Sequence, residues 1–333
     1  MNIAIVGATG NVGRKLLEVI EKLNFKFSEL YLIASDKSIG KKINFKGKTY
    51  SIVGLSDFNF SKVKIAFFSA GSAIAEKWAP IVAKKTIVID NSKHFRMDKD
   101  IPLVVPEVNA DTLKNYKNKN IIANANCSTI QLVLALKPLH DQFKIKRVIV
   151  STYQSVSGAG KEAMEELAKQ TAGLLNAREV KNEAFSRQIA FNVIPQIDVF
   201  QDNDYTKEEM KMVWETQKIM GDQSILVNAT AVRVPVFYGH AEAIHLETSS
   251  PIDAQHVKEL LADAPGVTVY DGNEQFPTQV SSASGNDIVH VGRIRNDISH
   301  PCGLNLWVVS DNIRKGAATN SIQIAETLIR DYL

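Results

Sequence analysis

Short apolar runs alternate with helical apolar spacing through the first third of the chain. Runs at 2–6, 30–34, 65–68, 86–89 and 121–123 have the length of buried strands. Between them, apolar residues recur three or four positions apart at 14–23, and 73–84 is compatible with a helix. This alternation predicts an α/β fold with a doubly wound parallel sheet of the Rossmann type over residues 1–126.

The pattern changes near residue 147. Longer strands are predicted at 147–153 and 226–233, separated by polar helices, which indicates a second, mixed α+β domain over 127–312. A final helix over 317–332 has apolar residues at helical spacing, and we expect the segment 313–333 to complete the first domain. Two domains also suit 333 residues, which exceed the size at which a single core keeps growing.

Composition excludes several classes of partner. The chain is 45% hydrophobic and 23% charged, as in ordinary globular proteins, and no apolar run reaches the length of a membrane span. Its first residues lack the basic flank of a signal peptide, so we expect a cytoplasmic protein. The 39 basic and 36 acidic residues leave a net charge of +3 without a polybasic stripe, which argues against nucleic-acid and membrane partners.

A glycine-rich turn follows the first strand and precedes the first helix. It reads Gly7-Ala-Thr-Gly-Asn-Val-Gly13. Glycines let the backbone approach a pyrophosphate, and the helix N-terminus presents free N–H groups to that anion. The candidate dinucleotide contacts are Gly7, Thr9, Gly10, Asn11, Val12 and Gly13. The spacing differs from the commoner Gly-x-Gly-x-x-Gly, so a turn without a ligand remains an alternative.

Hydroxyl and lysine side chains follow the second strand, where an acid usually binds the ribose of NAD. Ser35, Lys37 and Ser38 could hold a 2′-phosphate and favour NADP, whereas Asp36 argues for NAD. The lysines behind them, at 41 and 42, fit a solvated loop equally well.

Cys127 lies where an apolar strand pattern gives way to an apolar-periodic helix pattern. A helix N-terminus favours the thiolate, which is the nucleophilic form, so Cys127 is a candidate nucleophile. The alternative is a small buried hydrophobic residue. The other cysteine, Cys302, lies far along the chain and lacks a nearby base, so we expect two free thiols and a structural role for Cys302.

His240 is the candidate acid–base partner among seven histidines. It follows Pro235 and Gly239 at the end of a strand, with Arg233 seven residues upstream. A metal site at His240, Glu242 and His245 is the competing interpretation. Alternation along a strand puts the two histidines on opposite faces, so we expect no metal.

These blocks together resemble the aspartate-β-semialdehyde dehydrogenase family nearly end to end. The matching segments include Asn126-Cys-Ser-Thr-Ile-Gln131 and Gln154-Ser-Val-Ser-Gly-Ala-Gly160, together with 7–13, 88–92, 95–97, 104–109, 208–211, 233–240, 291–295 and 307–312. The chain departs from the family pattern at Lys93-His94, Ala125 and Lys37, which affects loop shape and cofactor affinity more than chemistry.

The resemblance implies an NADP-dependent enzyme that reduces L-aspartyl 4-phosphate to L-aspartate 4-semialdehyde and releases phosphate, on the route to lysine, threonine, methionine and isoleucine. It implies that Cys127 forms a thioester, that His240 transfers protons as an imidazole titrating near neutrality, and that Gln154 positions the acyl group. It further implies that the domain over 127–312 is catalytic and forms a homodimer, or a homotetramer built from two dimers.

The remaining roles also come from the resemblance. Arg233 binds the substrate carboxylate, which suits its planar fork, and Glu208 recognises the ammonium group. Lys211, Arg96 and Asn126 bind phosphate. Ser157, Gly158 and Asn312 approach the cofactor, with Asn312 facing the nicotinamide carboxamide. Without the resemblance, Glu208 and Lys211 are an ordinary surface pair on a helix.

Three alternative functions remain. An N-acetylglutamyl phosphate reductase would share the Rossmann start, the cysteine and a histidine, but not the residues for a free amino acid. A phosphorylating glyceraldehyde dehydrogenase would have different flanking sequences. A dinucleotide-binding redox sensor would not need a thiol, a histidine and anion-binding residues together.

Overall fold

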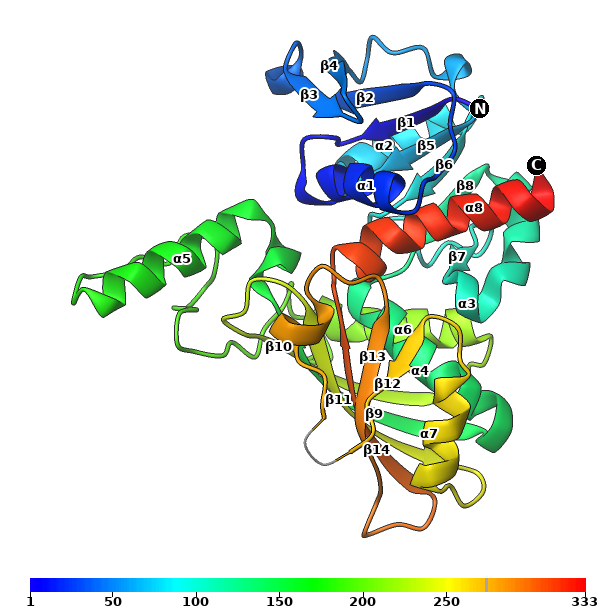
Figure 1. Ribbon diagram of the computed structural model, residues 1–333, viewed down its shortest axis with the longest axis vertical. Helices are drawn as coiled ribbons and strands as arrows, with labels where there is room; N and C mark the ends of the chain where they lie inside the picture. The colour runs from blue at the N-terminus through cyan, green and yellow to red at the C-terminus, as the bar shows by residue number, and fades with distance from the viewer. Residues whose placement is uncertain (273–274) are drawn as a thin grey trace. The chain divides into compact units, whose positions relative to one another are not determined.

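The chain divides into two units in the computed structural model, which describes residues 1–272 and 275–333 (Figure 1). One unit contains Met1–Asn126 and Ala317–Leu333, and the other contains Cys127–Gly316. The polypeptide therefore leaves the first unit at Asn126, directly before the candidate nucleophile, and returns to it for the last 17 residues.

An eight-stranded sheet organises the first unit, in the order β3-β4-β2-β1-β5-β6-β8-β7. Its strands are β1 (Ile3–Val6), β2 (Leu30–Ala34), β3 (Lys42–Phe45), β4 (Lys48–Gly54), β5 (Ile65–Phe68), β6 (Ile87–Asp90), β7 (Leu103–Val104) and β8 (Ile121–Asn124). All neighbouring pairs are parallel except β3 and β4. The predicted doubly wound sheet is confirmed, but the β3–β4 hairpin was not predicted because its partly exposed strands mix polar and apolar residues and lack a long apolar run.

Helices connect and cover these strands. They are α1 (Asn11–Lys22), α2 (Ser72–Val82), α3 (Pro106–Asn109) and α8 (Asn320–Tyr332), with a 3₁₀ segment at Ala110–Asn118. The C-terminal segment contributes Ala318, Ile322, Ile324, Ala325 and Leu328 to the same apolar core as β1 and α1. A buried amide also links it to the sheet, because Asn320 Nδ2 donates to Asn124 Oδ1 at 2.6 Å.

A six-stranded mixed sheet organises the second unit, in the order β10-β9-β11-β14-β13-β12. Its strands are β9 (Ile145–Gln154), β10 (Leu226–Arg233), β11 (His240–Thr248), β12 (Val267–Val269), β13 (Val289–Asn296) and β14 (Gly303–Ser310). The β9–β10 and β12–β13 pairs are parallel and the others are antiparallel.

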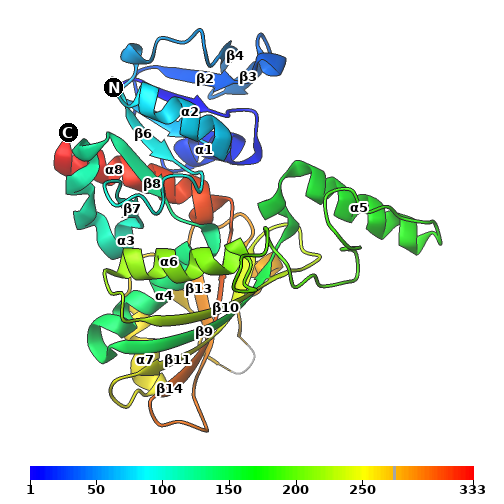
Figure 2. The ribbon, with the colours of Figure 1, turned by 180° about the vertical axis from the view of Figure 1, so that it is seen from behind.

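Two helices lie across this sheet, as Figure 2 shows: α4 (Cys127–Phe143) contacts β9, β11, β13 and β14, and α6 (Lys207–Met220) contacts β10 and α4. The other helices are α5 (Lys161–Leu175) and α7 (Ala254–Ala262). A π-helical turn, Arg314–Thr319, precedes α8, so the final α-helix begins three residues later than predicted.

None of the helices in the described ranges combines the length and the apolar character of a membrane-spanning segment.

Candidate active site

Cys127 is the first residue of α4, as predicted, and its side chain is half-buried and forms no disulfide with Cys302. The first turn consists of Cys, Ser, Thr and Ile, so the positive end of the helix dipole at the thiol is not offset by a carboxylate in that turn. The backbone of Gly316 passes close by, because a Cβ atom built there would lie 2.7 Å from Cys127 Cβ. The thiol therefore lies in a closely packed position, where the helix dipole favours the thiolate.

Strand pairing places three candidate side chains in one row. Gln154 ends β9, and its register partners are Arg233 at the end of β10 and His240 at the start of β11. Register partners point to the same face of a sheet, so all three side chains share a face. This is the face that α4 covers, because Glu242, two residues after His240 on the same strand, meets Gln131 of α4.

Gln154 is buried at the centre of this row. Its amide nitrogen donates to Ser128 Oγ in the first turn of α4, and to Glu208 Oε1 at 3.2 Å. The side chain is therefore held between the helix that carries the nucleophile and the helix that carries Glu208.

Arg233 is a buried cation in the same site. Its Nη1 donates to the Ser155 carbonyl at 2.7 Å. Burial lowers the pKa of Arg233, while the nearby Glu208 carboxylate and Cys127 thiolate act in the opposite direction. The guanidinium lies close enough to Cys127 to favour the ionised thiol, and its remaining donors can bind a carboxylate.

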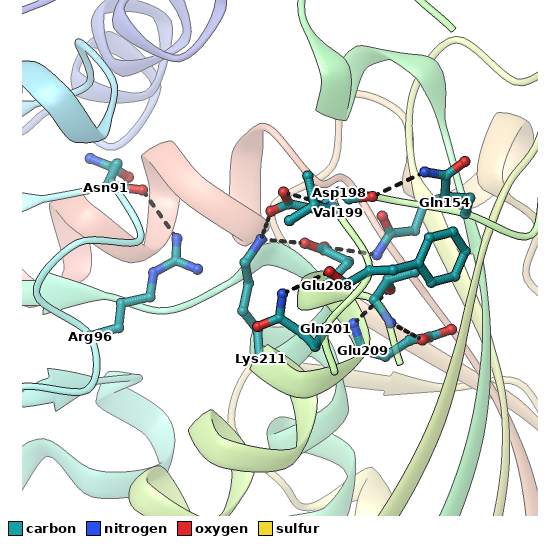
Figure 3. Close-up of polar contacts among 12 residues, drawn as sticks. Asn91, Arg96, Gln154, Asp198, Val199, Gln201, Glu208, Glu209 and Lys211 are labelled. Carbon is teal, nitrogen blue, oxygen red and sulfur yellow. Dashed lines mark hydrogen bonds and ion pairs between the residues drawn. The ribbon is translucent and has the colours of Figure 1, made fainter. Parts of the chain in front are cut away.

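Glu208 and Lys211 form a buried pair, as Figure 3 shows, so their interpretation as an ordinary surface pair is wrong. Their side chains are 7% and 12% exposed, and Lys211 Nζ lies 2.6 Å from Glu208 Oε2 and 3.1 Å from Asp198 Oδ2. Burial disfavours the Lys211 cation, but the two carboxylates outweigh it and raise its pKa. The helix places Glu208 in its first turn because Thr206 and Glu209 form a capping box.

His240 is fully buried, and its pKa is lowered to about 3 by burial and by the Arg233 charge. The expectation that it titrates near neutrality is therefore wrong. The physical reason is desolvation, which the sequence position could not reveal. The imidazole is neutral at physiological pH.

The candidate phosphate ligands Arg96 and Asn126 belong to the first unit. Arg96 follows β6, is buried, and donates from Nη2 to the Asn91 carbonyl at 3.1 Å (Figure 3). Asn126 is buried and directly precedes Cys127 in the chain. Lys211, the third candidate, belongs to the second unit.

The glycine-rich turn has the geometry that a dinucleotide site needs. Gly7 has φ +89°, and a Cβ atom there would lie 2.6 Å from the Ser69 carbonyl oxygen. A Cβ atom at Gly13 would lie 2.2 Å from the Gly7 carbonyl oxygen, so both positions require glycine. The side chains of Thr9 and Val12 are half-buried, and Val12 packs on the core.

The N-terminus of α1 is available to an anion. Gly10, which has no side chain, occupies the N-cap position, and the first turn consists of Asn, Val, Gly and Arg. The buried Asn11 Nδ2 has no hydrogen-bond partner within residues 1–272 and 275–333, so it is a further donor at this end of the helix. After β2, Ser35 and Lys37 are exposed, whereas Ser38 is largely buried.

Ser157, Gly158 and Asn312 lie beside the row of catalytic candidates. The Asn312 amide oxygen accepts from Ser155 Oγ at 3.0 Å, from Ser157 Oγ at 3.2 Å and from the Gly239 N–H at 3.0 Å. A Cβ atom at Gly158 would lie 3.1 Å from Arg233 Nη1 and 3.4 Å from His240 Nε2. The turn therefore borders the reacting groups as well as any cofactor.

The two histidines of the competing metal interpretation point to opposite faces of the sheet. His245 pairs with Asp297 at 2.7 Å, on the face opposite to His240. Cys302 is half-buried, and its N–H donates to His300 Nδ1 at 3.2 Å.

Sequence reasoning missed four residues at the site: Ser128, Ser155, Asp198 and Glu242. Period-two alternation from His240 would have put Glu242 on the same strand face, and Ser128 follows Cys127 directly. Asp198 lies in an irregular segment far from Lys211 in sequence, so no local pattern indicates it.

Comparison with known proteins finds similar sequences over nearly the whole chain. Family models match at residues 2–116, described as a semialdehyde dehydrogenase NAD binding domain, and at 136–315, described as a semialdehyde dehydrogenase dimerisation domain. "Aspartate-semialdehyde dehydrogenase 2" of Vibrio cholerae is 59% identical over 99% of this chain and 98% of its own length.

Two solved structures extend the comparison. The crystal structure of aspartate semialdehyde dehydrogenase II from Vibrio cholerae complexed with ASA has a TM-score of 0.98 at 59% identity, covering 100% of this chain and 99% of that one. The enzyme from Candida albicans with NADP has a TM-score of 0.75 at 26% identity, covering 98% of each chain. The chain belongs to the aspartate-semialdehyde dehydrogenase family.

Proposed function

We propose that this oxidoreductase catalyses the NADPH-dependent reductive dephosphorylation of L-aspartyl 4-phosphate to L-aspartate 4-semialdehyde, on the biosynthetic route to lysine, threonine, methionine and isoleucine. The observation that carries the proposal is the convergence of a helix-start thiol, a buried arginine, a buried imidazole and a buried Glu–Lys pair within the second unit. Relatives named aspartate-semialdehyde dehydrogenase match 99% of this chain, which supports the proposal.

Cys127 is the nucleophile of the proposed reaction. The thiolate, favoured by the helix N-terminus and Arg233, attacks the acyl carbon, and the C–O bond to phosphate breaks to leave a thioester. Bound NADPH would supply the hydride that reduces the thioester. The resulting thiohemiacetal then collapses, releasing the aldehyde and restoring the thiolate. Gln154 positions the acyl group, and His240 contacts its oxygen.

Buried charges recognise the two ends of the substrate in this proposal. Arg233 binds the α-carboxylate through its free guanidinium donors, and Glu208 binds the α-ammonium group. Lys211, Arg96 and Asn126 bind the phosphate that leaves. The Glu208–Lys211 pair supports these roles. When the substrate binds, the Glu208 carboxylate can pair with the substrate ammonium group and the Lys211 ammonium with the phosphate, so each buried charge keeps a partner of opposite sign.

We infer that NADP is preferred over NAD. The glycine-rich turn and the α1 N-terminus would hold the pyrophosphate, while the exposed Ser35 and Lys37, together with Ser38, would hold the 2′-phosphate. Ser157, Gly158 and Asn312 would border the nicotinamide. Michaelis constants for the two cofactors, measured side by side, would be lower for NADP if this inference is right.

We also infer the role of each domain and the oligomeric state. Residues 1–126 bind the dinucleotide and are completed by 313–333, whereas 127–312 carry catalysis and self-association. The match to a dimerisation domain and the exposed apolar side chains Phe191, Val193, Phe200 and Phe276 support a homodimer, alone or paired as a tetramer. A cytosolic location suits two cysteines that form no disulfide.

The direct test runs the reaction in reverse. Aspartate semialdehyde, phosphate and NADP should generate the absorbance of NADPH, and Cys127→Ala should abolish it while NADP binding persists. Turnover only with another aldehyde would reassign the substrate. No turnover with any aldehyde would favour a dinucleotide-binding sensor, and an active Cys127→Ala variant would remove Cys127 from the mechanism.

A further inference from the structure

Ser155 presents two polar groups to one ring nitrogen of His240. Its backbone nitrogen lies 3.1 Å from Nδ1 and its hydroxyl oxygen 3.2 Å from the same atom. Two polar contacts to one ring atom identify that atom as nitrogen and not carbon. A backbone N–H can only donate, so Nδ1 must accept and cannot carry a proton while this contact persists.

Asn312 holds Ser155 in place. The Asn312 amide oxygen accepts the Ser155 hydroxyl at 3.0 Å and the Gly239 N–H at 3.0 Å, and its nitrogen donates to Ser157 Oγ at 3.1 Å. One buried amide thus ties together the residue that contacts Nδ1 and the residue that directly precedes His240.

The neighbouring charges and carbonyls do not reverse this arrangement. The Gly239 carbonyl, which also accepts the Gln279 amide at 2.7 Å, favours a protonated ring, but its effect is smaller than those of burial and of the Arg233 charge. Glu208 also favours a cationic ring, whereas burial and Arg233 disfavour it more strongly. The ring is therefore neutral. Because Nδ1 accepts a hydrogen bond, the single ring proton lies on Nε2.

Nε2 is free to act on a ligand. It has no hydrogen-bond partner in the part of the chain that the structure describes, and it borders Gly158 close to Arg233 Nη1. A buried donor without a partner costs free energy unless a bound molecule or water accepts from it. The position beside Arg233 is one that the acyl group of a substrate can reach.

We propose that the Ser155 N–H, held in place by Asn312, fixes the resting His240 as a neutral imidazole protonated at Nε2, so that His240 can donate a hydrogen bond to the acyl oxygen. The identity of the acyl group rests on the proposed function, whereas the tautomer does not. Ser155 and Asn312 are positioning residues that act through His240, and the thiolate of Cys127 depends on the α4 N-terminus and Arg233.

Nitrogen-15 NMR of the full-length protein with labelled histidine tests this directly. The His240 signal is assigned by its absence from His240→Gln, and at neutral pH it should show a protonated Nε2 and an unprotonated Nδ1. A protonated Nδ1, or an imidazolium, in the resting protein would overturn the proposal. This measurement needs no turnover, so it stands apart from the assay that tests the proposed function.

Two substitutions at one position separate the N–H from the hydroxyl. Ser155 has φ −66°, which proline adopts, so Ser155→Pro removes the N–H, whereas Ser155→Ala keeps it. We expect Ser155→Ala to retain the Nε2–H form, and Ser155→Pro to lose it, with kcat at least about tenfold below that of Ser155→Ala and a KM within a few-fold of it. An unchanged tautomer in folded Ser155→Pro would contradict the proposal, and if that variant does not fold, the wild-type spectrum still decides.

Discussion

At the residue scale, the planar fork of Arg233 explains why this position is an arginine and not a lysine. One nitrogen is committed to the Ser155 carbonyl at 2.7 Å, and the other donors stay available for a carboxylate. A lysine could supply the charge but could not bind the carbonyl and a carboxylate in the same planar geometry.

We therefore predict that Arg233→Lys lowers kcat/KM for aspartate semialdehyde by about 10- to 100-fold, the range expected for losing a hydrogen bond to a charged group. Steady-state kinetics measure this. Arg147→Lys is the matched control, because Arg147 lies exposed on β9 and pairs with Glu247 at 3.6 Å. Equal kinetics of Arg233→Lys and wild type would rule out the carboxylate role.

Glu242 is a glutamate in the interior of the protein. Its side chain is fully buried on the strand face shared with His240, and neither carboxyl oxygen has a hydrogen-bond partner among the described residues. Burial raises the pKa of Glu242 well above its usual value, and the nearby Gln131 offsets this only in part. The carboxyl group is therefore neutral in the folded protein under conditions that ionise it in the unfolded chain.

This shift makes stability depend on pH. Below the unfolded pKa both states are protonated and no penalty exists, and as pH rises above it only the unfolded chain ionises, which favours unfolding. We predict that Glu242→Gln flattens the decline in the free energy of unfolding between pH 5 and 8, by up to about 1.4 kcal/mol per pH unit.

Denaturant unfolding across that pH range measures the slope. Glu259→Gln, an exposed glutamate on α7, is the control and should keep the wild-type slope. A Glu242→Gln slope equal to that of wild type would mean that Glu242 is ionised in the folded state.

Sequence reasoning could propose Cys127 and Arg233 because their expected chemistry follows from residue type and from a local helix or strand boundary, and the structure places both at such boundaries. It could not give the burial of Glu208 and Lys211 or the low pKa of His240. Those properties depend on which surfaces α6, β9 and β11 cover, and only the folded structure determines them.

At the element scale, the N-terminus of α1 lacks a side-chain cap, which costs helix stability. A glycine N-cap leaves the first N–H groups without a side-chain acceptor, whereas Ser, Thr, Asp or Asn would cap them. The helix therefore keeps donors and partial positive charge available for a pyrophosphate.

The substitution Asn11→Asp tests whether the uncapped helix end binds an anion at the expense of helix stability. A carboxylate in the first turn should leave thermal stability equal or raise it, by about 0.3–1 kcal/mol, while it repels the pyrophosphate and weakens NADP binding by about tenfold or more. Calorimetry and NADP titration measure the two effects. If NADP binds Asn11→Asp as tightly as wild type, the pyrophosphate does not lie at this helix end.

The elements themselves were predictable where apolar runs were long. The strands of the first sheet that lie in its centre, including β1, β2, β5, β6 and β8, have such runs and were predicted. The β3–β4 hairpin and the two-residue β7 were not, because exposed or very short strands leave no apolar period to recognise.

At the scale of the whole molecule, chain order explains how the nucleophile is placed. The chain leaves the first unit at Asn126 and begins α4 at Cys127, so along the chain only two residues separate the end of strand β8 in one unit from the first helix of the other. The strand-to-helix switch was visible in the sequence. The row formed by Arg233, Gln154 and His240 was not, because it depends on the register of three strands distant in sequence.

The central claim is that the sulfur of Cys127 carries the aspartyl group during turnover. The most direct measurement is mass spectrometry of protein quenched during reaction with aspartate semialdehyde and NADP in the absence of phosphate, followed by peptide mapping. The account predicts an aspartyl thioester on the peptide that contains Cys127, and none in Cys127→Ala. An unmodified Cys127 in protein that has formed NADPH under these conditions, or an acyl group on a different residue, would contradict it.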